Sequence, residues 1–137
     1  MEPKLILVVD DAEPTLVLLH QVLVHLGHSV VLASNGAEAI RQAQRHRPDL
    51  VLLDLEIEGE DPRETLRGFA REGWAATTPV IGLADRAAVV EAVQPGFAAF
   101  VRKPVVLPAL IEALRQCLAP PPAAEPVREF VLAEPPL

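Results

Sequence analysis

The chain has 137 residues, a length typical of one domain, and half of them are apolar, which excludes an intrinsically disordered protein. Its 12 basic and 19 acidic residues give a formal charge of −7, so no general field attracts it to nucleic acid or anionic lipid. The single cysteine, Cys117, excludes an internal disulfide and a thiolate zinc site, and no apolar run could span a membrane. We therefore expect a cytoplasmic protein with no direct nucleic-acid contact and no membrane partner.

Short apolar runs alternate with helical periods from the N-terminus to residue 118. The apolar runs predict buried strands at 5–9, 29–33, 50–53, 80–83 and 98–101. The helical periods predict helices at 14–26, 35–46, 63–72, 87–94 and 108–118, with Ser34 as the N-cap of the second. This alternation predicts an α/β fold with a parallel sheet, right-handed crossovers and helices on both faces.

Prolines concentrate at the end of the chain. Of the 14 prolines, six lie in the last 18 residues: Pro120, Pro121, Pro122, Pro126, Pro135 and Pro136. Consecutive prolines favour an extended spacer that cannot donate ladder hydrogen bonds, so we expect a domain over 1–118 and a proline-rich tail over 119–137. The tail is interpreted either as a flexible end or as a peptide that docks on a partner through Phe130, Val131 and Leu132.

Chemistry-bearing residues follow three of the predicted strands. Asp10, Asp11 and Asp54 stand at the carboxyl ends of the first and third strands, and Lys103 follows the fifth. In open α/β sheets ligands bind at this edge, and three neighbouring carboxylates repel one another unless a cation holds them. Oxygen ligation without cysteine or histidine favours Mg²⁺. A carboxylate beside such an ion, with a lysine nearby, is suited to attack phosphorus and form an acyl phosphate.

Three segments in this order resemble the receiver domain of two-component response regulators: Val8-Val9-Asp10-Asp11, Leu52-Leu53-Asp54 and Val101-Arg102-Lys103-Pro104. The resemblance covers about residues 3–118, with separations of 43 residues from Asp11 to Asp54 and 49 from Asp54 to Lys103. It implies a flavodoxin-like (βα)5 doubly wound sheet with strand order 2-1-3-4-5. It also implies that Asp54 accepts phosphate from the phosphohistidine of a histidine kinase or a histidine phosphotransfer protein.

The resemblance assigns roles to the other residues of this edge. The implied Mg²⁺ ligands are Asp10, Asp11, Asp54 and the backbone carbonyl of Glu56. Lys103 would contact the phosphoryl group, and the Lys103–Pro104 bond would be a cis peptide, a geometry that proline makes accessible. Phe100 falls at the position of the family's aromatic switch.

The fourth strand departs from the family pattern. Ala84 stands where the family has a threonine or serine whose hydroxyl binds the phosphoryl oxygen, and the 19-residue separation from Ala84 to Lys103 is about three shorter than usual. A hydrogen bond to a charged oxygen is worth about 1.5–3 kcal/mol, so its loss weakens the bias toward an active conformation. Four acidic residues are also expected to add negative charge beside the site: Glu56, Glu58, Glu60 and Asp61.

The first choice of function is therefore a receiver domain that is phosphorylated on Asp54 in a Mg²⁺-dependent step, signals through protein contacts, and is not an enzyme beyond its own phosphotransfer. The first alternative is a pseudo-receiver, an interaction module with phosphate-independent output, because Ala84 lacks the hydroxyl. The second is a small aspartate-dependent phosphohydrolase. The tail of about 19 residues is too short to form an output domain, so we expect either a stand-alone regulator that acts through protein contacts or a piece of a longer one.

Two predicted helices carry more apolar residues than one buried face requires. The first is apolar almost all round, because Val17, Leu18, Val22 and Val24 lie outside its leucine stripe. The fourth contains a run of small apolar residues over 87–90. Tolerated exposure, a kinase or phosphotransfer partner, and a homodimer are the alternatives for these surfaces. The four histidines, His20, His25, His28 and His46, show no consistent ligand spacing and are interpreted as surface or partly buried.

Overall fold

The computed structural model describes residues 2–71, 73, 77–93 and 95–118. In chain order the elements are β1 (Leu5–Val9), α1 (Glu13–His25), β2 (Ser29–Ala33), α2 (Gly36–His46), β3 (Leu50–Asp54), α3 (Pro62–Ala70), β4 (Val80–Ala84), α4 (Ala87–Val93), β5 (Ala99–Arg102) and α5 (Leu107–Leu118). Every predicted strand and helix is present, and no end differs from its predicted position by more than two residues. The predicted tail over 119–137, with residues 130–132, lies outside the described residues.

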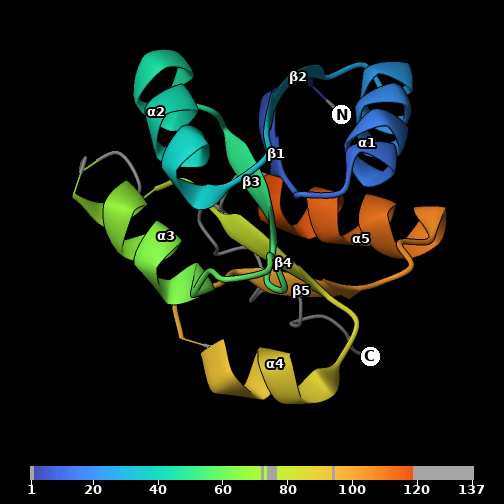
Figure 1. Ribbon diagram of the computed structural model, residues 1–137. Helices are drawn as coiled ribbons and strands as arrows, with labels where there is room; N and C mark the ends of the chain where they lie inside the picture. The colour runs from blue at the N-terminus through green and yellow to red at the C-terminus, as the bar shows by residue number, and fades with distance from the viewer. Residues whose placement is uncertain (1, 72, 74–76, 94, 119–137) are drawn as a thin grey trace, which may run out of the picture.

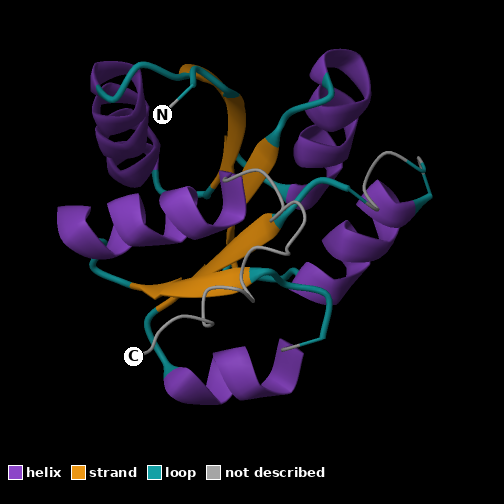
Figure 2. Ribbon diagram, turned by 180° about the vertical axis from the view of Figure 1, so that it is seen from behind, coloured by secondary structure: helices purple, strands orange, loops and turns teal. Residues whose placement is uncertain are grey.

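The five strands form one parallel sheet in the order β2-β1-β3-β4-β5, which confirms the predicted flavodoxin-like topology. Helices α1 and α5 cover one face, and α2, α3 and α4 cover the other (Figures 1 and 2). Alternate residues of a strand point to opposite faces. In β1, Ile6 and Val8 therefore pack with the α1–α5 layer, while Leu7 and Val9 pack with the other layer. The continuous apolar runs reflect this burial on both sides.

The N-terminus of α2 differs from the prediction that Ser34 caps it. Asn35 is the N-cap, with an extended backbone and a side chain that accepts a 2.8 Å hydrogen bond from the Glu38 amide. Ser34 instead donates its amide and its hydroxyl to the Glu38 carboxylate, at 2.8 and 3.1 Å. Both residue types can cap a helix. Here Asn35, one residue closer to the helix, is the N-cap. The two hydrogen bonds from Ser34 lower the pKa of Glu38.

Helix α1 buries one stripe, packs Leu16 and Val22 partly against the core, and exposes three large apolar residues. Leu19 and Leu23 are buried, whereas Val17, Leu18 and Val24 are 46%, 53% and 49% exposed. In α4, by contrast, Val89 and Val90 pack partly against the core, so that helix exposes less apolar surface than its sequence suggested. None of the described helices is both long enough and apolar enough to cross a lipid bilayer.

The strand register brings distant residues to one edge of the sheet. The last paired residues there are Val9 with Leu53, Asp54 with Leu83, and Ala84 with Arg102. Neighbouring strands lie about 4.8 Å apart. The residues at and just beyond these strand ends, Asp10, Asp54, Asp85 and Lys103, therefore occupy adjacent positions along this edge.

Candidate functional site at the carboxyl edge of the sheet

Two carboxylates are buried at the ends of β1 and β3. Asp10 is fully buried, and its Oδ1 accepts a 2.9 Å hydrogen bond from the Ala12 amide. Asp54 is 3% exposed, and its Oδ1 accepts a 3.0 Å hydrogen bond from the Glu56 amide. Burying a charge is costly unless it is paired. These two groups therefore need a positive partner at this edge.

Lys103 supplies that charge from the end of β5. Its Nζ lies 3.0 Å from Asp10 Oδ2 and 3.3 Å from Asp54 Oδ1, and its backbone amide donates a 2.9 Å bond to the Ala84 carbonyl. The Lys103–Pro104 peptide bond is cis. The ammonium approaches Asp10 Oδ2 without hydrogen-bond alignment, so this buried oxygen has no aligned donor among the described residues.

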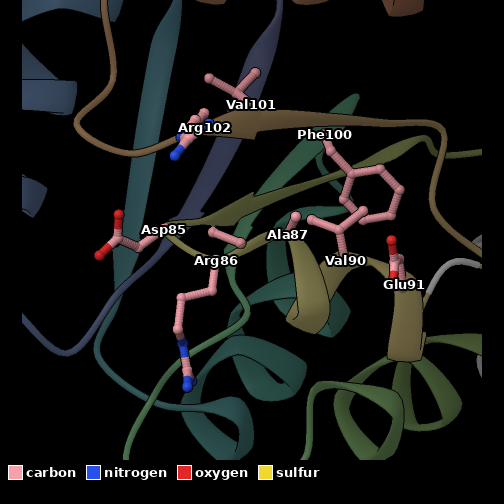
Figure 3. A pocket seen from close by; sticks show the side chains of 9 residues that line it. Asp85, Arg86, Ala87, Val90, Glu91, Phe100, Val101 and Arg102 are labelled. Atoms are coloured by element: carbon pink, nitrogen blue, oxygen red, sulfur yellow. The ribbon is translucent and has the colours of Figure 1, made fainter.

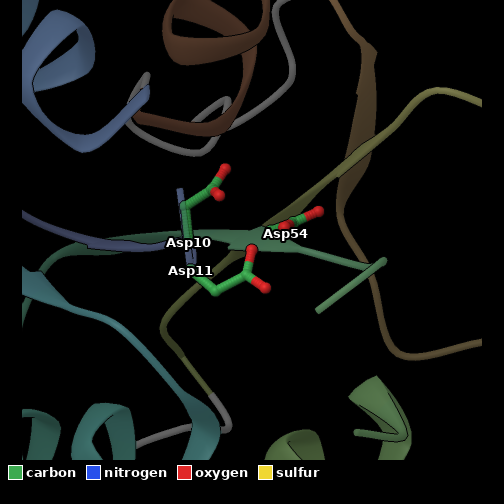
Figure 4. A group of neighbouring side chains, drawn as sticks. All are labelled: Asp10, Asp11 and Asp54. Carbon is green, nitrogen blue, oxygen red and sulfur yellow. The ribbon is translucent and has the colours of Figure 1, made fainter. Parts of the chain in front are cut away.

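Asp11 completes a group of three carboxylates. One carboxylate oxygen each from Asp10, Asp11 and Asp54 lie within 4.8 Å of one another, with Asp11 on the solvent side (Figure 4). Hard divalent cations take such oxygen-only ligand sets. The sequence placed these three residues together, and the fold brings them together.

The ionisation of the site reflects both burial and charge. Burial raises the pKa of Asp54, and the nearby Asp10 carboxylate raises it further, against the opposing effects of the Glu56 amide and Lys103. Burial by itself would lower the pKa of Lys103, but the carboxylates of Asp10 and Asp54 outweigh it and raise that pKa. One ammonium thus faces more negative charge than it can neutralise. The arrangement favours a further cation.

The β4 side of the edge is hollow by comparison. Ala84 is 3% exposed and ends β4 beside a cavity of about 300 Å³. Asp85, Arg86, Ala87, Val90, Glu91, Phe100, Val101 and Arg102 complete its lining (Figure 3). Because residue 84 is alanine, it offers no hydroxyl to this edge.

Phe100 packs inward next to this cavity. Its ring is half-buried and lies 5.2 Å, centroid to centroid, from the ring of Phe97. A Cβ on Gly82 would come within 2.9 Å of both Leu55 Cδ1 and Phe100 Cδ1. The missing side chain of Gly82 is what makes room for the ring over β4, a role that the sequence analysis did not assign.

Comparison with known proteins identifies the family. The family model described as the response regulator receiver domain matches residues 6–115. The chain is a member of the response regulator receiver family.

Curated relatives agree with this assignment, and a solved structure agrees with the fold. The receiver is 30% identical to the chemotaxis protein CheY of Bacillus subtilis, over 82% of this chain and 96% of CheY. It is 34% identical to the transcriptional regulatory protein KdpE of Mycobacterium tuberculosis, over 93% of this chain but 57% of KdpE. The fold matches a putative response regulator from Chloroflexus aurantiacus with a TM-score of 0.79 and 24% identity, over 87% of this chain and 100% of that one.

The Glu56 side chain joins the two sides of the receiver's edge. Its carboxylate accepts a 2.8 Å hydrogen bond from the Asp85 amide and a 3.0 Å hydrogen bond from Arg86 Nε. The Asp85 amide, and after it Arg86 and Lys103, lower the pKa of Glu56 against the opposing effect of burial. The sequence predicted the backbone carbonyl of Glu56 as a metal ligand and its side chain as added negative charge, but not its pairing with Arg86. The available signal was an arginine two residues beyond β4 and an acid two residues beyond β3.

Two of the acidic residues expected beside the site have other partners. The Glu60 carboxylate accepts a 2.9 Å hydrogen bond from the Gly36 amide at the start of α2. Asp61 is the N-cap of α3, and it binds the amide and the guanidinium of Arg63. Glu60 nevertheless lines the same small pocket as Asp54, so its charge stays near the site.

Proposed function

We propose that this receiver accepts a phosphoryl group on Asp54 from the phosphohistidine of a histidine kinase or histidine phosphotransfer protein. The observation that carries the proposal is the buried Asp54 carboxylate, which lies 3.3 Å from Lys103 Nζ and within 4.8 Å of two further carboxylates. In the transfer, an Asp54 oxygen forms a bond to phosphorus as the phosphorus–nitrogen bond of the donor breaks. The products are an acyl phosphate and an imidazole.

The residues present fit a magnesium ion. The candidate ligands are Asp10, Asp11, Asp54 and the backbone carbonyl of Glu56. Asp10 Oδ2 is buried without an aligned donor, which suits an atom that faces a cation. When bound, Mg²⁺ would supply positive charge for the phosphoryl oxygens.

In this proposal Lys103 binds and orients the phosphoryl group. Its ammonium already lies between Asp10 and Asp54, at 3.0 and 3.3 Å, so it needs little movement to reach an oxygen on a phosphorylated Asp54. Its raised pKa keeps it charged at neutral pH. A fixed cation at a developing negative charge is an efficient form of electrostatic stabilisation.

The domain over 1–118 would then act in the cytoplasm through protein contacts, with the tail over 119–137 as a spacer or a docking peptide. Homodimerisation remains an alternative for the exposed apolar side chains of α1. Ala84 and the adjacent cavity favour a second candidate, a pseudo-receiver whose output does not depend on phosphate. In that case the acidic cluster would serve structure or metal binding alone.

Phosphorylation of the full chain with acetyl phosphate and Mg²⁺ tests the proposal. Mass spectrometry should detect one added phosphoryl group on the wild type and none on Asp54→Asn. Asp49→Asn is the matched control, because Asp49 precedes β3 at the opposite edge. Its side chain holds the Leu5 amide through a bond that asparagine can keep. This control should be phosphorylated normally.

Other outcomes select other functions. If neither acetyl phosphate nor a phosphorylated histidine donor labels the wild type, the pseudo-receiver replaces the receiver proposal. Rapid multiple turnover of unrelated phosphate esters would support a phosphohydrolase.

Metal binding is tested separately. Mg²⁺ should raise the melting temperature of the wild type but not of Asp11→Asn, since Asp11 is exposed and its loss leaves the buried core intact.

A further inference from the structure

Two hydrogen-bond donors at the start of the β4–α4 loop are occupied by an acid of the receiver itself. The Asp85 amide bonds to one oxygen of Glu56 at 2.8 Å, and Arg86 Nε bonds to the other at 3.0 Å. Among charged side chains, arginine is well suited to bind planar or tetrahedral oxyanions. The donors therefore form an anion-binding pair, in which the Glu56 carboxylate is the anion present.

This pair lies next to the proposed phosphorylation site. Asp54 is paired with Leu83 across β3 and β4, so Glu56 and Asp85 are each two residues beyond this pair, and Arg86 follows directly. The Glu56 amide bonds to Asp54 Oδ1 at 3.0 Å, and the Lys103 amide bonds to the carbonyl of Ala84 at 2.9 Å. Glu56, the pair and Lys103 are thus held around one point of the edge.

The pair also lies beside the position that lacks a hydroxyl. Ala84 is adjacent to Asp85, and the methyl group of Ala84 can donate nothing to a phosphoryl oxygen. The side chain of Arg86 is 72% exposed and extends away from Phe100 (Figure 3), while the cavity of about 300 Å³ lined by Ala84 and Arg86 leaves the loop room to move. The guanidinium can therefore change partners without disrupting the core.

We infer that Arg86 and the Asp85 amide bind the phosphoryl group on Asp54 in place of the missing hydroxyl, and that the Glu56 carboxylate occupies them beforehand. This inference rests on the proposed phosphorylation of Asp54. A phosphoryl group carries up to two negative charges and three acceptor oxygens. It repels the Glu56 carboxylate and competes with it for the same two donors. Phosphorylation thereby exchanges one anion for another on the β4–α4 loop.

Binding of beryllofluoride, a non-covalent phosphoryl mimic, tests the exchange on the full chain with Mg²⁺ and fluorine NMR. Arg86→Ala should weaken binding about tenfold, the lower part of the range for hydrogen bonds to charged groups, because Arg86 is exposed. Glu56→Gln should strengthen binding, because it removes the competing charge but keeps the side-chain shape. Arg63→Ala removes the same charge from an exposed pair on α3 and should leave the affinity unchanged.

A double variant and a rescue separate direct binding from a general charge effect. The gain from Glu56→Gln should largely vanish in Arg86→Ala, because the freed donor is gone. Ala84→Ser should recover part of the affinity lost in Arg86→Ala by returning a hydroxyl beside the site. A merely structural Arg86 would lower the melting temperature without this dependence on Glu56 and Ala84.

The inference and the proposed function can fail separately. Unchanged affinity in Arg86→Ala, with a wild type that binds the mimic and is phosphorylated on Asp54, overturns the inference and leaves the function standing. Equal effects of Glu56→Gln with and without Arg86 also overturn it. A wild type that neither binds the mimic nor accepts phosphate removes both.

Discussion

The two sides of the receiver's functional edge are built in opposite ways. On the β1–β3 side, Asp10 and Asp54 are buried at 0% and 3% exposure and depend on Lys103 for compensating charge. On the β4 side, Gly82 and Ala84 are the smallest residues, and a cavity of about 300 Å³ lies beside them. The first side carries the groups on which the proposed transfer depends. The second side offers no hydroxyl at position 84.

Besides the β3–β4 ladder, two of the described residues connect the two sides. The Lys103 amide bonds to the Ala84 carbonyl, while its ammonium reaches Asp10 and Asp54. The Glu56 carboxylate bonds to the Asp85 amide and to Arg86. Substitutions at each side should therefore have effects of different physical origin, electrostatic on the first and steric on the second.

Lys103→Met should have the largest effect on stability. It removes the cation from two buried carboxylates, and breaking such a pair on one side costs about 3 kcal/mol. The measurement is urea unfolding at pH 8 without divalent ions. Arg102→Met, at an exposed position one residue earlier on the same strand end, is the control and should cost far less. Equal stability of Lys103→Met and wild type would show that the Lys103 charge does not stabilise the buried carboxylates of the β1–β3 side.

Gly82→Ala should cause the second-largest loss of stability, and the size of this loss should not depend on salt. The added Cβ would lie 2.9 Å from Leu55 Cδ1 and from Phe100 Cδ1, and overpacking of this kind costs about 2 kcal/mol. Urea unfolding at low and high salt measures it. Phe100→Leu in the same chain should recover part of the loss by removing one of the two contacts. If the double variant is no more stable than Gly82→Ala, the ring does not set the packing of the β4 side.

Asp54→Asn should stabilise the metal-free receiver by about 1 kcal/mol, as expected when a strained functional group is neutralised. Burial and the Asp10 charge raise the pKa of Asp54 in the folded state above its ordinary value. The ionised carboxyl therefore destabilises the fold increasingly as pH rises through the folded-state pKa. The advantage of Asp54→Asn in urea unfolding should grow over that rise and shrink at lower pH. A constant advantage would show that packing, not ionisation, is responsible.

The smallest effect is expected at His28, which is remote from both sides. His28 is 5% exposed, and its Nδ1 accepts a 3.1 Å hydrogen bond from the Lys4 amide. Burial, and the positive N-terminus, lower its pKa from 6.5. The unfolded chain therefore takes up a proton first, and stability is lost as pH falls below about 6.5. His28→Gln should reduce this loss in thermal unfolding between pH 7.5 and 5. An unchanged loss would assign acid sensitivity to other groups.

The pattern of apolar residues along the chain was enough to predict the strands and their alternation with helices. A run such as residues 50–53 is buried on both faces whatever its neighbours are, because it has no polar side to expose. The same runs placed Asp10, Asp54 and Lys103 at carboxyl strand ends, and parallel pairing then brings such ends together. The metal-type cluster followed from those two facts.

Choices among several possible partners were not predictable in this way. Ser34 and Asn35 both have capping side chains, and only the backbone at the start of α2 decided for Asn35. Glu60 accepts a hydrogen bond from the Gly36 amide at the start of α2, a partner that the sequence did not indicate. The histidine expected at the surface or partly buried, His28, became a buried acceptor for a residue 24 positions away. Each depends on where another segment packs.

The sequence alone determined the layers of this receiver, the edge at which its chemistry lies, and the residues that bring charge there. Hydrophobic period and chain order are local properties, so they can be read without coordinates. Only the tertiary structure decided that Glu56 holds Asp85 and Arg86, and that Gly82 admits the ring of Phe100. These contacts join segments 18 to 30 residues apart in the sequence, and their distances and geometry are set by the packing of the whole sheet.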